Sequence, residues 1–167
     1  MGFVAIRRSR RRGFTLVEIL VVLVIIALVG GLALVTLGRD ERGLAAREAK
    51  RFAGALEFAA ARAQARNETL GVSADRTIRF WRREPSGERW LPLDDDVLGA
   101  RVLPEPLLAT PLSYAGQRVA GNTIVLFRAS GRNEPFAFML ASPTWLVVLA
   151  ADPLNRVSID GPVPNTP

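Results

Sequence analysis

Residues 13–37 read GFTLVEILVVLVIIALVGGLALVTL, and this segment determines the architecture of the whole chain. From Ile19 to Leu37 it holds 19 residues and no charge. At the α-helical rise this run is about 28 Å long, close to the thickness of the hydrocarbon core of a bilayer. It is apolar on every side, unlike the amphipathic helices of globular domains. We therefore predict a membrane-spanning helix over residues 14–37 and not a helix buried in a protein core.

A basic leader precedes this helix. Its five arginines are Arg7, Arg8, Arg10, Arg11 and Arg12. Without them the chain has 17 basic and 16 acidic residues, so the formal net charge of +6 belongs mostly to the leader. A secretory signal peptide has its small-residue cleavage site after the apolar stretch, whereas Gly13 stands before it. A cut after Gly13 would remove residues 1–13 and leave the helix as a permanent anchor.

The orientation of the anchor follows from where the arginines lie. Basic residues flank the span on both sides, because residues 39–51 contain five more. The leader packs its arginines immediately beside the span, and long C-terminal domains cross membranes largely regardless of their charge. We expect a single-pass protein with a cytoplasmic N-terminus.

Glu18 lies near the start of the apolar run, where an ionised carboxylate costs several kcal/mol unless it is paired. One interpretation is that the side chain reaches the lipid headgroups, since the charged leader is only one turn away. The other is that it pairs with a positive charge. After a cut behind Gly13, the new α-amino group of Phe14 would supply this charge, on the same helix or on a neighbouring copy. We favour the second interpretation.

Residues 12–20, RGFTLVEIL, resemble the class III signal of type IV pilins and type II secretion pseudopilins. The resemblance implies that a prepilin peptidase cuts between Gly13 and Phe14 and methylates the new N-terminus of Phe14. It assigns Glu18 to subunit assembly. It also implies three kinds of partner: the peptidase, the other pseudopilins of a filament, and the lipid of the inner membrane. The C-terminal domain would then lie in the periplasm.

The apolar run departs from many major pilins at one place. Those pilins have a proline about two-thirds of the way along the membrane helix, where this chain has Gly30 and Gly31. A glycine pair can soften a helix, which would permit local melting on assembly. It can equally permit close packing of helices. Both interpretations stay open.

The helical pattern continues over residues 38–67 as an amphipathic segment. Its apolar stripe consists of Ala45, Ala49, Phe52, Ala53, Leu56, Ala59, Ala60 and Ala63. Because most of these side chains are small, we expect a β-sheet to pack close to the helix. Glu48, Glu57 and Glu68 alternate with the basic residues of the remaining surface, which predicts a solvated face and not a nucleic-acid surface. A helix from Phe14 to about Asn67 would be about 80 Å long.

From Thr69 onward the pattern changes to short β-type runs. The predicted strands are residues 77–82, 97–102, 123–128, 136–141, 144–150 and 156–159. Residues 128–135 read as a hairpin loop, and residues 152–155 as a turn with Asn155 in the left-handed region. The predicted fold is α+β and pilin-like: a long N-terminal helix packed on an antiparallel β-sheet domain over residues 68–160. Residues 161–167 form a proline-rich tail.

The second half of the chain resembles one branch of the same family, the minor pseudopilin H of type II secretion. The resemblance rests on residues 89–98, RWLPLDDDVL, and on residues 124–131 and 135–140, IVLFRASG and PFAFML. It implies a structural subunit of a periplasmic pseudopilus that exports folded proteins across the outer membrane. The alternative is a minor type IV pilin of the related FimT group, which serves pilus assembly or DNA uptake. DNA capture would require a basic cluster, but the last 12 residues hold one Arg and one Asp.

The composition argues against catalysis. Without His or Cys there is no Ser-His-Asp or Cys-His system, no thiolate or imidazole zinc site and no disulfide. Residues 94–96 are three consecutive aspartates, but an extended chain points alternate side chains in opposite directions, so we predict no Ca²⁺ site. Trp81, Trp90 and Trp145 are explained as covers of core edges. We expect no enzyme, no cofactor, no metal and no nucleic-acid partner.

Overall fold

The computed structural model describes residues 16–166, and for residues 29–40 it describes the backbone alone. The leader, with Gly13 and Phe14, lies outside these residues, and so do the side chains of residues 29–37 in the predicted membrane span. The chain divides into two units, residues 1–37 and 38–167.

The helix α1 runs from Leu16 to Arg66. The segment has no proline and is rich in alanine and leucine, the residues that favour helices most. It ends at Asn67, whose φ of 51° is left-handed. The N–H groups of Asn67 and Glu68 donate to the carbonyls of Gln64 and Ala63, at 3.4 and 3.0 Å. This is the Schellman motif, which satisfies carbonyls that the last turn leaves free.

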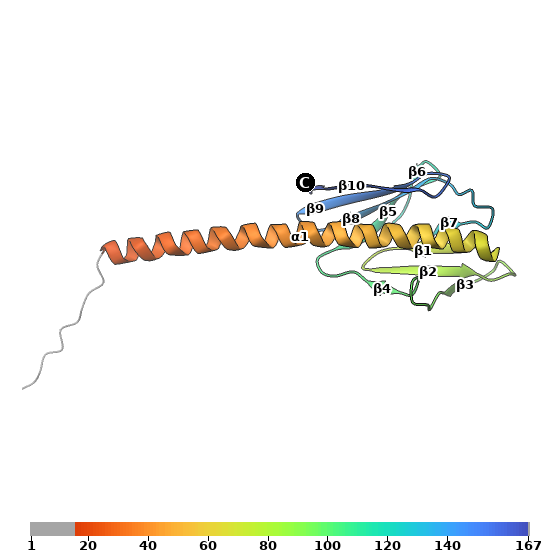
Figure 1. Ribbon diagram of the computed structural model, residues 1–167, viewed down its shortest axis with the longest axis horizontal. Helices are drawn as coiled ribbons and strands as arrows, with labels where there is room; N and C mark the ends of the chain where they lie inside the picture. The colour runs from red at the N-terminus through yellow and green to blue at the C-terminus, as the bar shows by residue number, and fades with distance from the viewer. Residues whose placement is uncertain (1–15, 167) are drawn as a thin grey trace, which may run out of the picture. The chain divides into compact units, whose positions relative to one another are not determined.

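The strands form two antiparallel sheets (Figure 1). Their bounds are β1 Leu70–Ser73, β2 Thr77–Arg83, β3 Trp90–Pro92, β4 Arg101–Val102, β5 Leu108–Tyr114, β6 Gln117–Arg118, β7 Val125–Phe127, β8 Phe136–Ala141, β9 Trp145–Ala151 and β10 Val157–Pro164. The first sheet has the order β3-β2-β1-β7, with β4 also paired to β2. The second has the order β10-β9-β8-β5-β6. The predicted α+β fold is confirmed, with two sheets around the helix.

The core lies between the second part of α1 and both sheets. All eight residues of the predicted apolar stripe are buried. The ring of Phe52 meets Phe138 of β8 edge to face, with centroids 5.2 Å apart. Leu70 of β1 and Phe80 of β2 complete the same core from the other sheet. The small stripe thus packs on sheets as predicted, because alanine side chains let the strands approach the helix closely.

One strand prediction and one loop prediction need correction. Of residues 97–102, only Arg101 and Val102 form a strand, β4. Residues before them fold into a turn, because one oxygen of Asp95 accepts the N–H groups of Val97 and Leu98 at 3.0 and 2.7 Å. The loop of residues 128–135 is not a hairpin. It connects the two sheets, since β7 pairs with β1 whereas β8 pairs with β5 and β9.

Four strands were not predicted: β1, β3, β5 and β6. In β5, Pro111 obscures the pattern, since proline disfavours a strand interior. The structure accommodates it next to a shift of register between Pro111 and Ser113. At the C-terminus β10 extends to Pro164, and Val163 and Pro164 of the predicted tail pair with β9 after a shift of register that follows Asp160. The turn at residues 152–155 is confirmed, with Asn155 at a φ of 63°.

Candidate assembly surface

The first part of α1 exposes its apolar side chains. Every residue from Leu16 to Leu28 is exposed. Leu16 is 82% exposed, and Ile26 and Leu28 are 62% and 64% exposed. A continuous apolar surface of this kind marks a site that binds lipid or protein. No helix in the part of the chain that the structure describes is both long and apolar enough to span a membrane.

Glu18 lies in the first turn of α1 and is exposed. A carboxylate in this position is stabilised by the free N–H groups and the dipole at a helix N-terminus. Its predicted partner, the α-amino group of Phe14, lies outside the described residues. The pairing of these two groups therefore stays a prediction.

The turn between β8 and β9 holds α1 where the second unit begins. Glu41 of α1 accepts hydrogen bonds from the hydroxyls of Thr144 and Ser142. Asn165 holds the same turn from its other side. Its N–H donates to the carbonyl of Thr144 at 2.9 Å, and its Nδ2 donates to that of Ser142 at 2.8 Å. Asn165 near the C-terminus thus hydrogen-bonds to the same turn that hydrogen-bonds to Glu41 of α1.

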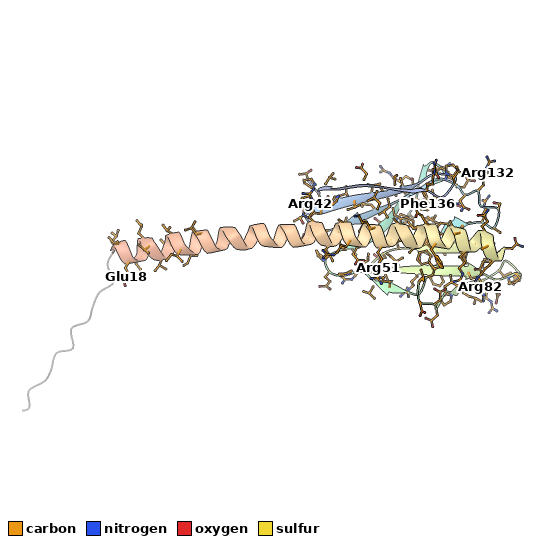
Figure 2. All side chains as sticks on the ribbon, in the orientation of Figure 1. Glu18, Arg42, Arg51, Arg82, Arg132 and Phe136 are labelled. Atoms are coloured by element: carbon orange, nitrogen blue, oxygen red, sulfur yellow. The ribbon has the colours of Figure 1, made fainter. Side chains whose placement is uncertain are left out.

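The three tryptophans make contacts within the chain. The Nε1–H of Trp81 donates to a serine hydroxyl of β1 at 2.8 Å. The guanidinium of Arg83 lies over Trp90, 5.8 Å from the ring centroid, and that of Arg42 lies over Trp145 at 5.2 Å. Figure 2 shows Arg42 on α1 beside the strands. Two of the three rings are thus covered by cations from the same chain.

An ion pair that the sequence did not reveal joins α1 to β4. The prediction that Glu48 belongs to a solvated face is wrong, because Glu48 is only 8% exposed. The Nη2 of Arg101 lies 2.7 Å from its Oε1 and 2.5 Å from its Oε2. Because Glu48 is buried, removal of Arg101 would leave an uncompensated carboxylate in the protein, which is destabilising.

A second ionic cluster joins the end of α1 to the aspartate segment. Arg62 donates to Glu68 at 2.9 Å and also pairs with Asp95. The hydrogen bond from the N–H of Leu98, supported by Arg62, lowers the pKa of Asp95. Burial opposes the charge of Arg62, but the hydrogen bonds to Glu68 and Asp95 outweigh it and raise its pKa. Asp95 thus acts as a cap and an ion-pair partner. Among the described residues no cluster of potential metal ligands occurs.

Two family models match the chain. Residues 8–34 match the prokaryotic N-terminal methylation motif. Residues 48–159 match the family of the type II transport protein GspH, which is more than half of the chain. The chain belongs to the GspH family. The predicted resemblance to this branch is confirmed.

Individual proteins agree with the family. The type II secretion system protein H of Pseudomonas aeruginosa is 32% identical over 146 residues, which cover 78% of this GspH chain and 83% of that protein. Its Escherichia coli counterpart is 37% identical over 95 residues, 53% of this chain. The chain spans about half of this second relative, 55% of its length. The minor pseudopilin EpsH of Vibrio cholerae has the same fold, with a TM-score of 0.57 and 17% identity over 71% of this chain and 96% of its own.

Proposed function

We propose that this GspH-family chain is a minor pseudopilin of a type II secretion system, a structural subunit of the periplasmic filament that exports folded proteins. The observation that carries this proposal is the succession of two matches in one chain: the methylation motif over residues 8–34 and the GspH family over residues 48–159. The packed unit supplies a folded domain, and the apolar residues before it supply a surface for assembly.

We propose further that residues 14–37 anchor the chain in the inner membrane, with the N-terminus in the cytoplasm and residues 38–167 in the periplasm. A prepilin peptidase would cut between Gly13 and Phe14 and methylate Phe14. The exposed apolar surface of α1 supports this part of the proposal, because it needs a cover of lipid before assembly and of neighbouring helices after it. Glu18 and the ammonium of Phe14 would neutralise each other between adjacent subunits.

The charge distribution favours secretion over DNA uptake. DNA capture depends on cations that are free to replace the counterions of phosphates. Arg156, the only arginine of the C-terminal segment, pairs with Asp152 at 2.7 Å. Arg89 pairs with Glu84 at 3.2 Å. These two arginines are thus already paired with acidic residues of the same chain.

The location of exoproteins in a deletion strain tests the proposal. We expect the strain that lacks this chain to accumulate exoproteins in the periplasm and to lose them from the medium. A plasmid copy of the wild-type chain should restore them to the medium. Unchanged secretion in the deletion strain, together with a loss of pili or of DNA uptake, would contradict the proposal.

A further inference from the structure

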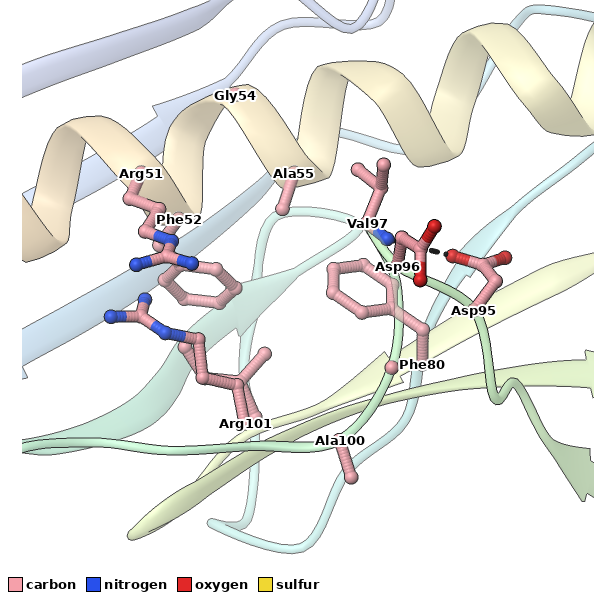
Figure 3. Close-up of a pocket in the computed structure, with 12 residues that line it drawn as sticks. Arg51, Phe52, Gly54, Ala55, Phe80, Asp95, Asp96, Val97, Ala100 and Arg101 are labelled. Atoms are coloured by element: carbon pink, nitrogen blue, oxygen red, sulfur yellow. Dashed lines mark hydrogen bonds between the residues drawn. The ribbon is translucent and has the colours of Figure 1, made fainter.

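A pocket of about 530 Å³ lies between α1 and the segment of residues 95–101 (Figure 3). Its lining includes Phe52 of α1 and Ile78 and Phe80 of β2, all of them at most 4% exposed. Gly54 of α1 also lines the pocket and is exposed, and a Cβ at this position would meet no atom within 4 Å. The pocket therefore has an apolar base, and charged side chains line much of the rest of it: Arg51, Asp95, Asp96 and Arg101.

The wall opposite α1 is rigid. Asp95 accepts hydrogen bonds from Val97 and Leu98 and pairs with Arg62 of α1. The N–H of Gly99 donates to the carbonyl of Asp95 at 2.9 Å, and a Cβ on Gly99 would come within 2.6 Å of that oxygen. These contacts fix the wall before any partner binds, which lowers the entropy cost of binding.

The two ends of the pocket carry opposite charges. Figure 3 shows Arg51 and Arg101 toward one end and Asp95 and Asp96 toward the other. Glu48 neutralises Arg101, and Arg62 neutralises Asp95. Within residues 41–166, whose side chains the structure describes, Arg51 and Asp96 form no ion pair. The pocket thus has an unpaired cation at one end and an unpaired anion at the other, with an apolar floor between them.

A neighbouring hollow extends this surface along α1. It is lined by Phe58 and Val97, which are 45% and 54% exposed, and it shares the wall of residues 95–97 with the pocket. Two neighbouring hollows along a helix suit an extended protein segment better than a compact small molecule. The apolar floor favours binding of an apolar side chain. The unpaired charges at the two ends of the pocket favour a bound segment with an acidic residue at one end and a basic residue at the other.

We propose that this pocket receives an apolar side chain of another filament subunit, held between an acidic residue that pairs with Arg51 and a basic residue that pairs with Asp96. The inference rests on the proposed function, because the filament supplies the neighbour. According to this inference, the face of α1 at Gly54 determines which subunit binds there. This role differs from that of the apolar surface of residues 16–28.

Two pairs of variants of the full chain test the pocket. Arg51→Glu inverts the free cation, and Lys50→Glu makes the same change at an adjacent exposed residue that does not line the pocket. Gly54→Leu adds a large side chain to the α1 side of the lining, and Gly54→Ala, which adds only a methyl group, is its control. Alanine and leucine both favour an exposed helical site over glycine, so neither change should impair folding.

Each variant is expressed in a strain that lacks the chromosomal copy, and the membranes are treated with a chemical cross-linker. The chain is then purified, and the other subunits of the same filament are quantified by mass spectrometry. We expect Arg51→Glu and Gly54→Leu to reduce the recovery of one particular subunit roughly tenfold, and the two controls to keep it within about twofold. An acid-to-lysine change on that subunit should restore its recovery with Arg51→Glu.

If all four variants recover the other subunits at the wild-type level, the proposed role of the pocket is wrong and the proposed function is unaffected. An equal loss in Lys50→Glu would also contradict the role of the pocket, because the effect would then reflect charge in general. If the wild-type chain recovers no filament subunit, both the proposed role of the pocket and the proposed function are wrong.

Discussion

The bond between Gly13 and Phe14 separates the basic leader from the apolar run, and we propose that the chain functions only after this bond is cut. If the peptidase requires the small residue at the position before the cut, a branched side chain there should block cleavage. We predict that Gly13→Leu keeps all 13 leader residues. Intact-mass spectrometry of the membrane fraction measures this directly, with Gly2→Leu as the matched change inside the leader. Mature-sized protein from Gly13→Leu would refute the cut.

Asp95 makes the stability of the domain depend on pH. Its pKa is lowered in the folded state by the N–H of Leu98 and by Arg62. A carboxylate of this kind stabilises the fold above its unfolded pKa of about 3.9, and the contribution is lost as the pH falls through the folded pKa. We predict that Asp95→Asn lowers the urea midpoint at pH 7 and that the difference from wild type shrinks toward pH 3.

Asp96→Asn is the control for this experiment, because Asp96 is exposed and forms no hydrogen bond in the described part of the chain. The urea midpoint of Asp96→Asn should differ little from that of the wild type at both pH 3 and pH 7. An effect of Asp95→Asn that is equal at pH 3 and pH 7 would show that the carboxylate acts through packing and not through its charge.

Among the elements, α1 provides the largest single contribution to the core. Leu56 is fully buried in the hydrophobic core. We predict that Leu56→Ala lowers the free energy of unfolding by about 2–5 kcal/mol, since it leaves a cavity that the rigid surroundings fill only in part. Urea unfolding of the mature chain in detergent measures the change. Arg47→Ala, on the exposed side of the same helix, should stay within about 0.5 kcal/mol, and an equal loss there would contradict the account.

The elements also show what a sequence can reveal. The helix and its stripe were predictable, because helical periodicity is a local property of the chain. The pair of Glu48 and Arg101 was not, because its partners are 53 positions apart and only the fold joins them. Strand β1 was missed because it is short and contains Gly71. The glycine is required by packing, since a Cβ there would lie 2.5 Å from Ile124.

The candidate site, like the fold, could be predicted only in part. The motif at Gly13, Phe14 and Glu18 lies within one short stretch of sequence, so it can be recognised without knowledge of the fold. The pocket beside Gly54 could not be predicted. Its wall depends on a turn capped by Asp95, in a region where the strand pattern pointed to β-structure.

For the whole molecule, one helix has two different surroundings. Its first part exposes apolar side chains that nothing in the described residues covers, and its second part is enclosed by two sheets. This division matches a subunit that keeps its own folded domain while it joins others through the helix. Loss of the charge on Glu18 should therefore affect assembly without affecting the fold.

The most direct test is the amount of this chain in pseudopili sheared from cells that overproduce the major subunit. Immunoblots of the filament fraction should detect the wild-type chain. They should show at least tenfold less of Glu18→Ala, although that variant is processed to the mature mass, because an uncompensated terminal ammonium opposes packing between helices. Glu18→Ala at the wild-type level in filaments, or absence of the wild-type chain from them, would contradict the account.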